Sequence, residues 1–161
     1  MSEVLSKESW ARIDREIEKY PPDQKKSAVM SALTIAQDEQ GWLSTQTMDA
    51  VAGHLDMPPV AVYEVATFYA MYDLEALGKH KLTICTNLPC ALSGANEAAA
   101  HLKRCLNIGW NETTADGRVT LKEGECFGAC GDAPVILHNN KKMLIGMTPG
   151  RIDTLLADLK K

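Results

Sequence analysis

The chain has 161 residues, 45% hydrophobic and 24% charged, which is enough apolar material for one medium-sized domain or two small ones. Its net charge is −4 and its basic residues are scattered, which argues against a nucleic-acid partner. No apolar run reaches the roughly 18 to 20 residues of a membrane span, and the charged N-terminus does not resemble a signal peptide, so we expect a cytoplasmic protein without direct membrane insertion.

The first forty residues are expected to form two helices. In the first, apolar residues recur at helical spacing: Trp10, Ile13, Ile17 and Tyr20. Pro21 and Pro22 end this segment. Asp23 is a candidate N-cap of the second helix, and Gly41 stands where a C-terminal glycine is favoured. The inward face of this second helix is predicted to carry Val29, Leu33 and Ala36.

Two further helices are predicted before residue 75. Ser44 is a candidate N-cap of a helix that runs to about Leu55. Pro58 and Pro59 open a fourth segment, "VAVYEVATFYAMY", whose β-branched and aromatic residues also fit a buried strand. Four short helices with brief connections over residues 1–75 predict a small helical bundle.

The pattern changes after Gly78. "HKLTIC" alternates as a half-buried strand does, with Leu82 and Ile84 on one side. "ALSGANEAAAHLKRCL" is expected to be one helix, followed by a strand at "GRVTLKE". The apolar face of that helix is predicted to consist of Leu92, Ala95, Ala99, Leu102 and Leu106.

The C-terminal part is expected to add a hairpin and a last helix. "PVILHNNKKMLIGM" reads as two strands joined by a turn at Asn139 and Asn140, and Thr148 and Pro149 can start a helix. The order β-α-β followed by β-β-α predicts a thioredoxin-like α/β domain over residues 78–161. The chain is therefore predicted to be α+β, with a helical bundle followed by this domain.

Four of the five cysteines form a pattern, C-x4-C-x35-C-x3-C, made by Cys85, Cys90, Cys126 and Cys130. Both pairs fall in loops beside strand ends, and the predicted fold places the two loops at the same end of the sheet. Four thiolates there can hold a [2Fe–2S] cluster, which takes four cysteine ligands.

The glycines near these cysteines fit the same reading. Gly94, Gly128 and Gly131 let the backbone turn and approach closely enough for N–H groups to bond to sulfur.

Spacing alone leaves two alternatives open. Structural zinc also takes four sulfurs, although its sites usually use tighter C-x2-4-C pairs. Incidental buried cysteines are the other alternative. Thiol–disulfide exchange is disfavoured because the chain has no C-x-x-C pair.

The motifs "CTNLPC" and "ECFGACGDAP", with "VYEVATFYAMY" and "QDEQGWLS" upstream, resemble the E-subunit family of bacterial NADH:quinone oxidoreductases (complex I). That family belongs to the thioredoxin-like [2Fe–2S] ferredoxins. The resemblance covers nearly the whole chain and implies that Cys85, Cys90, Cys126 and Cys130 ligate one [2Fe–2S] cluster. It also implies docking on a flavin-bearing, NADH-oxidising partner, which would hold the FMN and the NADH, in the peripheral arm of the membrane complex.

The resemblance implies an electron-transfer protein that binds no substrate itself, with residues 1–75 serving for docking. Related subunits serve NAD-linked hydrogenases and formate dehydrogenases, so these complexes are alternative parents. A zinc-stabilised bridging module is the rival from a different class. Cys105, inside a predicted helix without a cysteine neighbour at ligand spacing, is expected to be a small buried hydrophobe.

Overall fold

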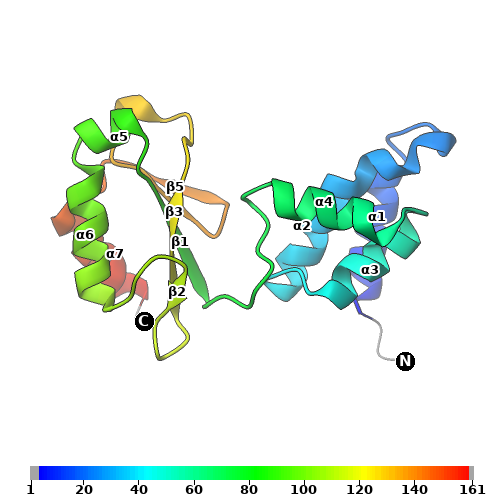
Figure 1. Ribbon diagram of the computed structural model, residues 1–161, viewed down its shortest axis with the longest axis horizontal. Coiled ribbons are helices and arrows are strands. Elements are labelled where there is room, and N and C mark those ends of the chain that lie inside the picture. Colours follow the sequence, from blue (N-terminus) through cyan, green and yellow to red (C-terminus); the bar gives the residue numbers. More distant parts are fainter. Residues whose placement is uncertain (1–3, 160–161) are drawn as a thin grey trace. The chain divides into compact units, whose positions relative to one another are not determined.

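The computed structural model describes residues 4–159, and the chain divides into two compact units, Met1–Ala76 and Leu77–Lys161 (Figure 1). Each unit has its own hydrophobic core. Within residues 4–159, no helix is both long enough and apolar enough to cross a membrane.

Among its described residues, the first unit contains helices joined by loops and no strand. Its elements are α1 (Lys7–Ile17), the 3₁₀ segment η1 (Pro22–Ala28), α2 (Val29–Gln40), α3 (Thr45–His54) and α4 (Pro59–Phe68). The four predicted helices are confirmed, and α4 is a helix rather than the alternative strand. Pro59 is tolerated at its first position because the N–H that proline lacks has no partner inside a helix there.

Local sequence sets most helix ends in this unit. The hydroxyl of Ser44 accepts a hydrogen bond from the Thr47 N–H at 3.1 Å and caps α3. Gly41 ends α2 with φ = 84°, in the left-handed region that favours glycine. The prediction that Asp23 caps the second helix is wrong, because residues 22–28 form the 3₁₀ segment and α2 begins only at Val29.

The core of the first unit lies between these helices. Ile13 of α1, Leu33 of α2, Val51 of α3 and Val62 of α4 are each 0% exposed. Burying each such side chain contributes about 1.5–3 kcal/mol, so the helices are held by mutual packing more than by their own propensity.

The second unit is built on a five-stranded sheet in the order β2-β3-β1-β4-β5. Its strands are β1 (His80–Cys85), β2 (Glu112–Thr113), β3 (Val119–Gly124), β4 (Ile136–His138) and β5 (Lys142–Leu144). Its helices are α5 (Leu88–Leu92), α6 (Ala95–Leu106), the 3₁₀ turn η2 (Cys130–Asp132) and α7 (Pro149–Leu159).

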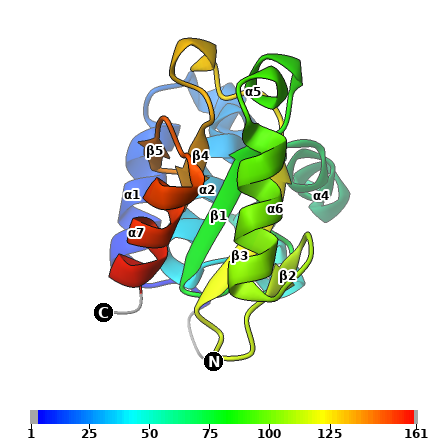
Figure 2. The ribbon, with the colours of Figure 1, turned by 90° about the vertical axis from the view of Figure 1, so that its left-hand side faces the viewer.

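Strands β1 and β3 are parallel, and the other pairs are antiparallel. Helices α6 and α7 lie together over one face of this sheet (Figures 1 and 2). Side chains from both layers fill the space between them, including Ile84, Leu121, Leu102 and Ile152, each 0% exposed. The thioredoxin-like fold predicted for this part of the chain is confirmed.

Two sequence predictions need correction here. The segment expected as one helix is two, because the backbone at Gly94 takes φ = 94° between α5 and α6. Leu92, assigned to the buried face, therefore belongs to α5 and is 80% exposed. Strand β2 was not predicted, because two exposed residues carry no hydrophobic pattern.

The predicted hairpin is confirmed. Asn139 and Asn140 join β4 to β5 with φ of 50° and 56°, as a tight primed turn requires. The side chain of Asn139 also accepts a hydrogen bond from the Lys81 N–H at 2.7 Å, which ties the turn to β1.

Candidate metal centre

The four cysteines of the spacing pattern lie at one end of the sheet. Cys85 is the last residue of β1, and its parallel partner on β3 is Gly124, so the loops that follow both strands start side by side. Cys90 lies in α5, in the first of these loops. Cys126 lies in the second loop and Cys130 begins η2. Figures 1 and 2 both show α5 beside the short helical turn after β3.

The thiols of these residues act on one another. The pKa of Cys90 is raised to about 11. Burial of the thiol is the largest cause, followed by a hydrogen bond with Cys85 and by the charges of Cys85 and Cys130. The pKa of Cys130 is raised mainly by a hydrogen bond with Cys126, and Cys85 contributes to that rise. The parallel pairing of β1 with β3 links the two pairs, because it brings the loops that carry them to the same end of the sheet.

This linkage has a chemical consequence. Each thiolate makes the next deprotonation harder, so four thiolates are stable together only around a cation that offsets their charge. All five cysteines of the chain are free thiols, so no disulfide uses up the donors. The four thiols therefore match the four cysteine ligands that a [2Fe–2S] cluster takes.

The two cysteine pairs differ in solvent access. Cys85 and Cys90 are 1% and 3% exposed, packed with Ala95 against Phe127 and Ala133, whereas Cys126 and Cys130 are exposed. A cofactor held by all four would have one side shielded from water by apolar groups and the other side facing outward.

The backbone around the outer pair is shaped by glycine. Gly128 takes φ = 76° and donates its N–H to the sulfur of Cys126 at 3.3 Å, as expected for a loop that stabilises a thiolate. Gly94 also has a positive φ, but its role is to end α5. Gly131 does not take a positive φ, so a special backbone conformation is not what places glycine there.

Polar side chains join the two loops, and no sequence pattern predicted them. The amide of Asn87 donates to Glu125 at 2.8 Å, and the hydroxyl of Thr86 donates to Glu123 at 2.8 Å. The sulfur of Cys85 lies 3.9 Å from the Asn87 side-chain oxygen, within hydrogen-bonding range for sulfur. The Thr86 and Asn87 partners are 37 and 38 residues away in the chain, too far for a local signal to mark them.

Cys105 does not belong to this group. It lies near the C-terminal end of α6, and the expectation that it is a buried hydrophobe is wrong because its side chain is exposed. Its sulfur instead lies 3.4 Å from a ring nitrogen of His101, one helical turn earlier.

Comparison with known proteins agrees with this arrangement. Residues 13–160 match the family described as thioredoxin-like [2Fe-2S] ferredoxin. The chain is 43% identical over 125 residues to the E subunit of the NADH-quinone oxidoreductase of Rickettsia felis, covering 77% of this chain and 75% of that protein. It is 37% identical over 142 residues to NADH-quinone oxidoreductase subunit 2 of Thermus thermophilus, covering 88% and 78%.

A solved NAD+-reducing [NiFe]-hydrogenase, in its H2-reduced state, has a similar fold with a TM-score of 0.72. The match covers 82% of this chain but only 22% of the hydrogenase chain, at 21% identity, so it shows the fold alone. The family match, in contrast, extends through both units of this protein. The chain therefore belongs to the thioredoxin-like [2Fe–2S] ferredoxin family.

Proposed function

We propose that this protein is the electron-transfer E subunit of an NADH:quinone oxidoreductase, in which Cys85, Cys90, Cys126 and Cys130 hold one [2Fe–2S] cluster. The observation that carries this proposal is the placement of four cysteines in the two loops that follow the parallel strand pair β1–β3. Family membership and identity of up to 43% to proteins of that name support it.

The bound cluster supplies one-electron exchange with the flavin of a partner subunit that oxidises NADH. The residues of this chain would ligate and shield it. Cys85 and Cys90 would hold its inner side in an apolar pocket with Phe127, while Cys126 and Cys130 face outward. Exposure on that side would bring the cluster near a cofactor on another chain.

Exposed apolar side chains support a partner at this end of the second unit. On α5, Leu88 is 71% exposed and Leu92 is 80% exposed, on either side of Cys90. Large apolar groups that stay in water are typical of protein contact surfaces. We place the flavin-bearing subunit against this end, with no substrate site on this chain itself.

The first unit would mainly provide attachment to the peripheral arm of the complex. Most of its exposed large apolar side chains belong to α4 and the segment that follows: Val60, Phe68, Tyr69, Met71 and Leu74. Phe68 is 79% exposed, an unusual position for an aromatic residue unless another surface covers it.

A second candidate function is that of the equivalent subunit of an NAD+-reducing hydrogenase. The structural likeness to such a hydrogenase has only 21% sequence identity, so it supports a shared fold and no more. Co-purification separates the two, because an oxidoreductase subunit would bring quinone-linked partners and a hydrogenase subunit a nickel-containing one.

The ligand assignment is tested by replacing each cysteine with alanine and measuring iron and acid-labile sulfide in the purified protein. Alanine at any of the four positions removes one thiolate and should abolish or severely reduce cluster content. Cys105→Ala is the matched control and should retain it. A colourless Cys105→Ala protein beside a normally coloured Cys90→Ala protein would overturn the assignment.

The cofactor class is tested by chemical reduction. A [2Fe–2S] protein should take up one electron per chain and give a paramagnetic signal at low temperature. About one zinc per chain and no such signal would instead support the zinc-stabilised bridging module.

A further inference from the structure

A second group of metal-ligating side chains lies away from the four cysteines. His101 and Cys105 stand four residues apart on α6 and so share one face of that helix. Asp153 reaches them from α7, which packs beside α6 over the sheet (Figure 2). A histidine nitrogen, a cysteine sulfur and a carboxylate oxygen thus meet between two helices.

The three ligand atoms converge on a small region. The His101 Nε2 lies 2.7 Å from the Asp153 Oδ1, and the Cys105 Sγ lies 3.4 Å from that nitrogen and 3.9 Å from that oxygen. Both partners approach the same ring nitrogen. A nucleophilic relay needs the carboxylate on one ring nitrogen and the thiol on the other, so this arrangement is not a catalytic triad.

We infer that His101, Cys105 and Asp153 form a zinc site with a fourth coordination position left open. Zinc prefers this mixture of nitrogen, sulfur and oxygen donors, at bond lengths of about 2.0–2.3 Å. Tetrahedral geometry at those lengths separates ligand atoms by about 3.3–3.6 Å. The observed separations of 2.7, 3.4 and 3.9 Å bracket this range, so small side-chain rotations suffice to bring the donors around an ion.

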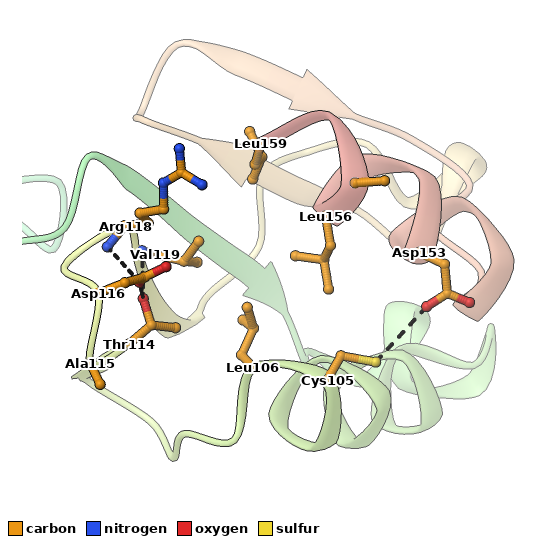
Figure 3. A pocket seen from close by; sticks show the side chains of 11 residues that line it. Cys105, Leu106, Thr114, Ala115, Asp116, Arg118, Val119, Asp153, Leu156 and Leu159 are labelled. Carbon is orange, nitrogen blue, oxygen red and sulfur yellow. Dashed lines mark hydrogen bonds between the residues drawn. The ribbon is translucent and has the colours of Figure 1, made fainter. Parts of the chain in front are cut away.

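The site is open on one side. Cys105 and Asp153 also line a cavity of about 730 Å³, drawn in Figure 3, between the end of α6, α7 and the β2–β3 loop. Its walls combine apolar side chains such as Leu106 and Leu156 with the polar residues of that loop. Since a water molecule takes up about 30 Å³, the cavity admits water or a small ligand to the side of the ion.

The site is separate from the four-cysteine centre. Ala95, at the start of α6, packs against Cys85 and Cys90, and Cys105 lies ten residues further along the same helix. Ten residues of α-helix span about 15 Å, too far for one metal centre to use both sets of sulfurs.

The first experiment measures zinc uptake by the full-length, cluster-loaded protein in equilibrium dialysis against Zn²⁺, with metal analysis of zinc and iron. The wild type should take up about one zinc per chain without losing iron. His101→Ala, Cys105→Ala and Asp153→Asn should each weaken uptake by about tenfold or more, because each removes one of three ligands. Cys105 and Asp153 are exposed, where substitutions leave folding largely intact, and the half-buried His101 keeps 20% of its side chain in solvent.

The matched control is His54→Ala. His54 also pairs with a carboxylate, at 2.6 Å from Asp14, but no cysteine completes a ligand set there. This variant should bind zinc like the wild type. Absence of uptake by the wild type, or equal uptake by the three ligand variants, would overturn the site.

The second experiment locates the bound zinc through the thiol. Cys105 is exposed, so iodoacetamide should alkylate it in the cluster-loaded protein, and mass spectrometry of its peptide gives the rate. Zinc bound to the thiolate should slow this rate about tenfold or more, and His101→Ala should abolish the protection. An unchanged alkylation rate at saturating zinc would place the metal elsewhere and refute the proposal.

Discussion

At the scale of single residues, Gly124 leaves room for close packing at the end of β3, beside the cysteine loops. It ends β3 opposite Cys85, and the ring of Phe127 folds back over it beside the buried thiols. A methyl group built on Gly124 would lie 2.6 Å from the Thr83 methyl and 2.7 Å from the Phe127 ring. Only a residue without a side chain leaves that space to the aromatic ring.

We therefore expect Gly124→Ala to lower the free energy of unfolding by about 1–3 kcal/mol, the usual cost of overpacking, and to reduce the iron bound per chain. Denaturant unfolding and metal analysis measure the two effects. Gly150→Ala is the control, because a methyl group there meets nothing within 4 Å, and the change from glycine to alanine inside α7 should raise stability by up to about 1 kcal/mol. Wild-type stability and iron content in Gly124→Ala would show that Phe127 can move aside at no cost.

Ser44 makes a contribution that can be measured separately, in the first unit. Its hydroxyl satisfies the Thr47 N–H at the start of α3. Ser44→Ala should cost about 1 kcal/mol of unfolding free energy, as loss of an N-cap usually does. Thr45→Ala, the next residue on the exposed side, should change stability by less than about 0.5 kcal/mol. A similar loss in both variants would assign the effect to the helix turn rather than to the cap.

At the scale of elements, strands β1 and β4 bring two histidines together. The Nδ1 of His80 lies 3.1 Å from the Nε2 of His138, so one ring donates and the other accepts. The pKa of His80 is lowered, mainly by burial and then by the charges of Lys79 and Arg118. The pKa of His138 is also lowered, mainly by burial and then by the charges of His80 and Lys142. The folded sheet therefore favours both rings without a charge.

The pH dependence follows from the direction of these shifts. A histidine in the unfolded chain takes up a proton near pH 6.5, more readily than the paired rings do. Protonation thus favours the unfolded chain, so stability should be constant above about pH 6.5 and fall as the pH drops below it. Urea unfolding of the second unit, followed between about pH 7.5 and 6.0, measures this loss.

His138→Gln should flatten that profile, because it removes one of the two rings whose pKa is lowered. His54→Gln, a histidine of the first unit, should leave it unchanged. An equally steep acid loss in His138→Gln would show that groups other than the histidine pair govern stability in this range.

At the scale of the whole molecule, the two units carry different parts of the proposed function. All four cysteines of the centre lie in Leu77–Lys161, and the exposed aromatic side chains around Phe68 lie in Met1–Ala76. A chain that exchanges electrons needs both a cofactor site and a fixed position beside its partner. We expect the first unit to contribute mainly to that position.

Deleting residues 1–76 should therefore leave a reddish protein that still holds its iron but binds the flavin-bearing subunit much more weakly than the full chain. Pull-down against the co-expressed partner, with iron analysis of both proteins, measures this. Equal binding by the shortened chain would show that the helices are not the attachment. Loss of iron would show that the second unit depends on the first.

Much of this protein could be predicted from local sequence patterns. Helical spacing around Ile13, the N-cap at Ser44 and the turn at Asn139 depend on neighbours within a few residues, so the sequence alone indicated them. The cysteine spacing and the order of strands also predicted that the loops of Cys85 and Cys126 would meet, because parallel strands end at the same edge of a sheet.

The rest depended on contacts between residues far apart in the chain. Only the tertiary structure decided that Leu92 turns to solvent after the break at Gly94, and that Asn87 meets Glu125. It also decided that Cys105 is exposed beside Asp153, 48 residues away. Such pairs follow from how helices pack on the sheet, a balance of many small interactions that no short segment encodes.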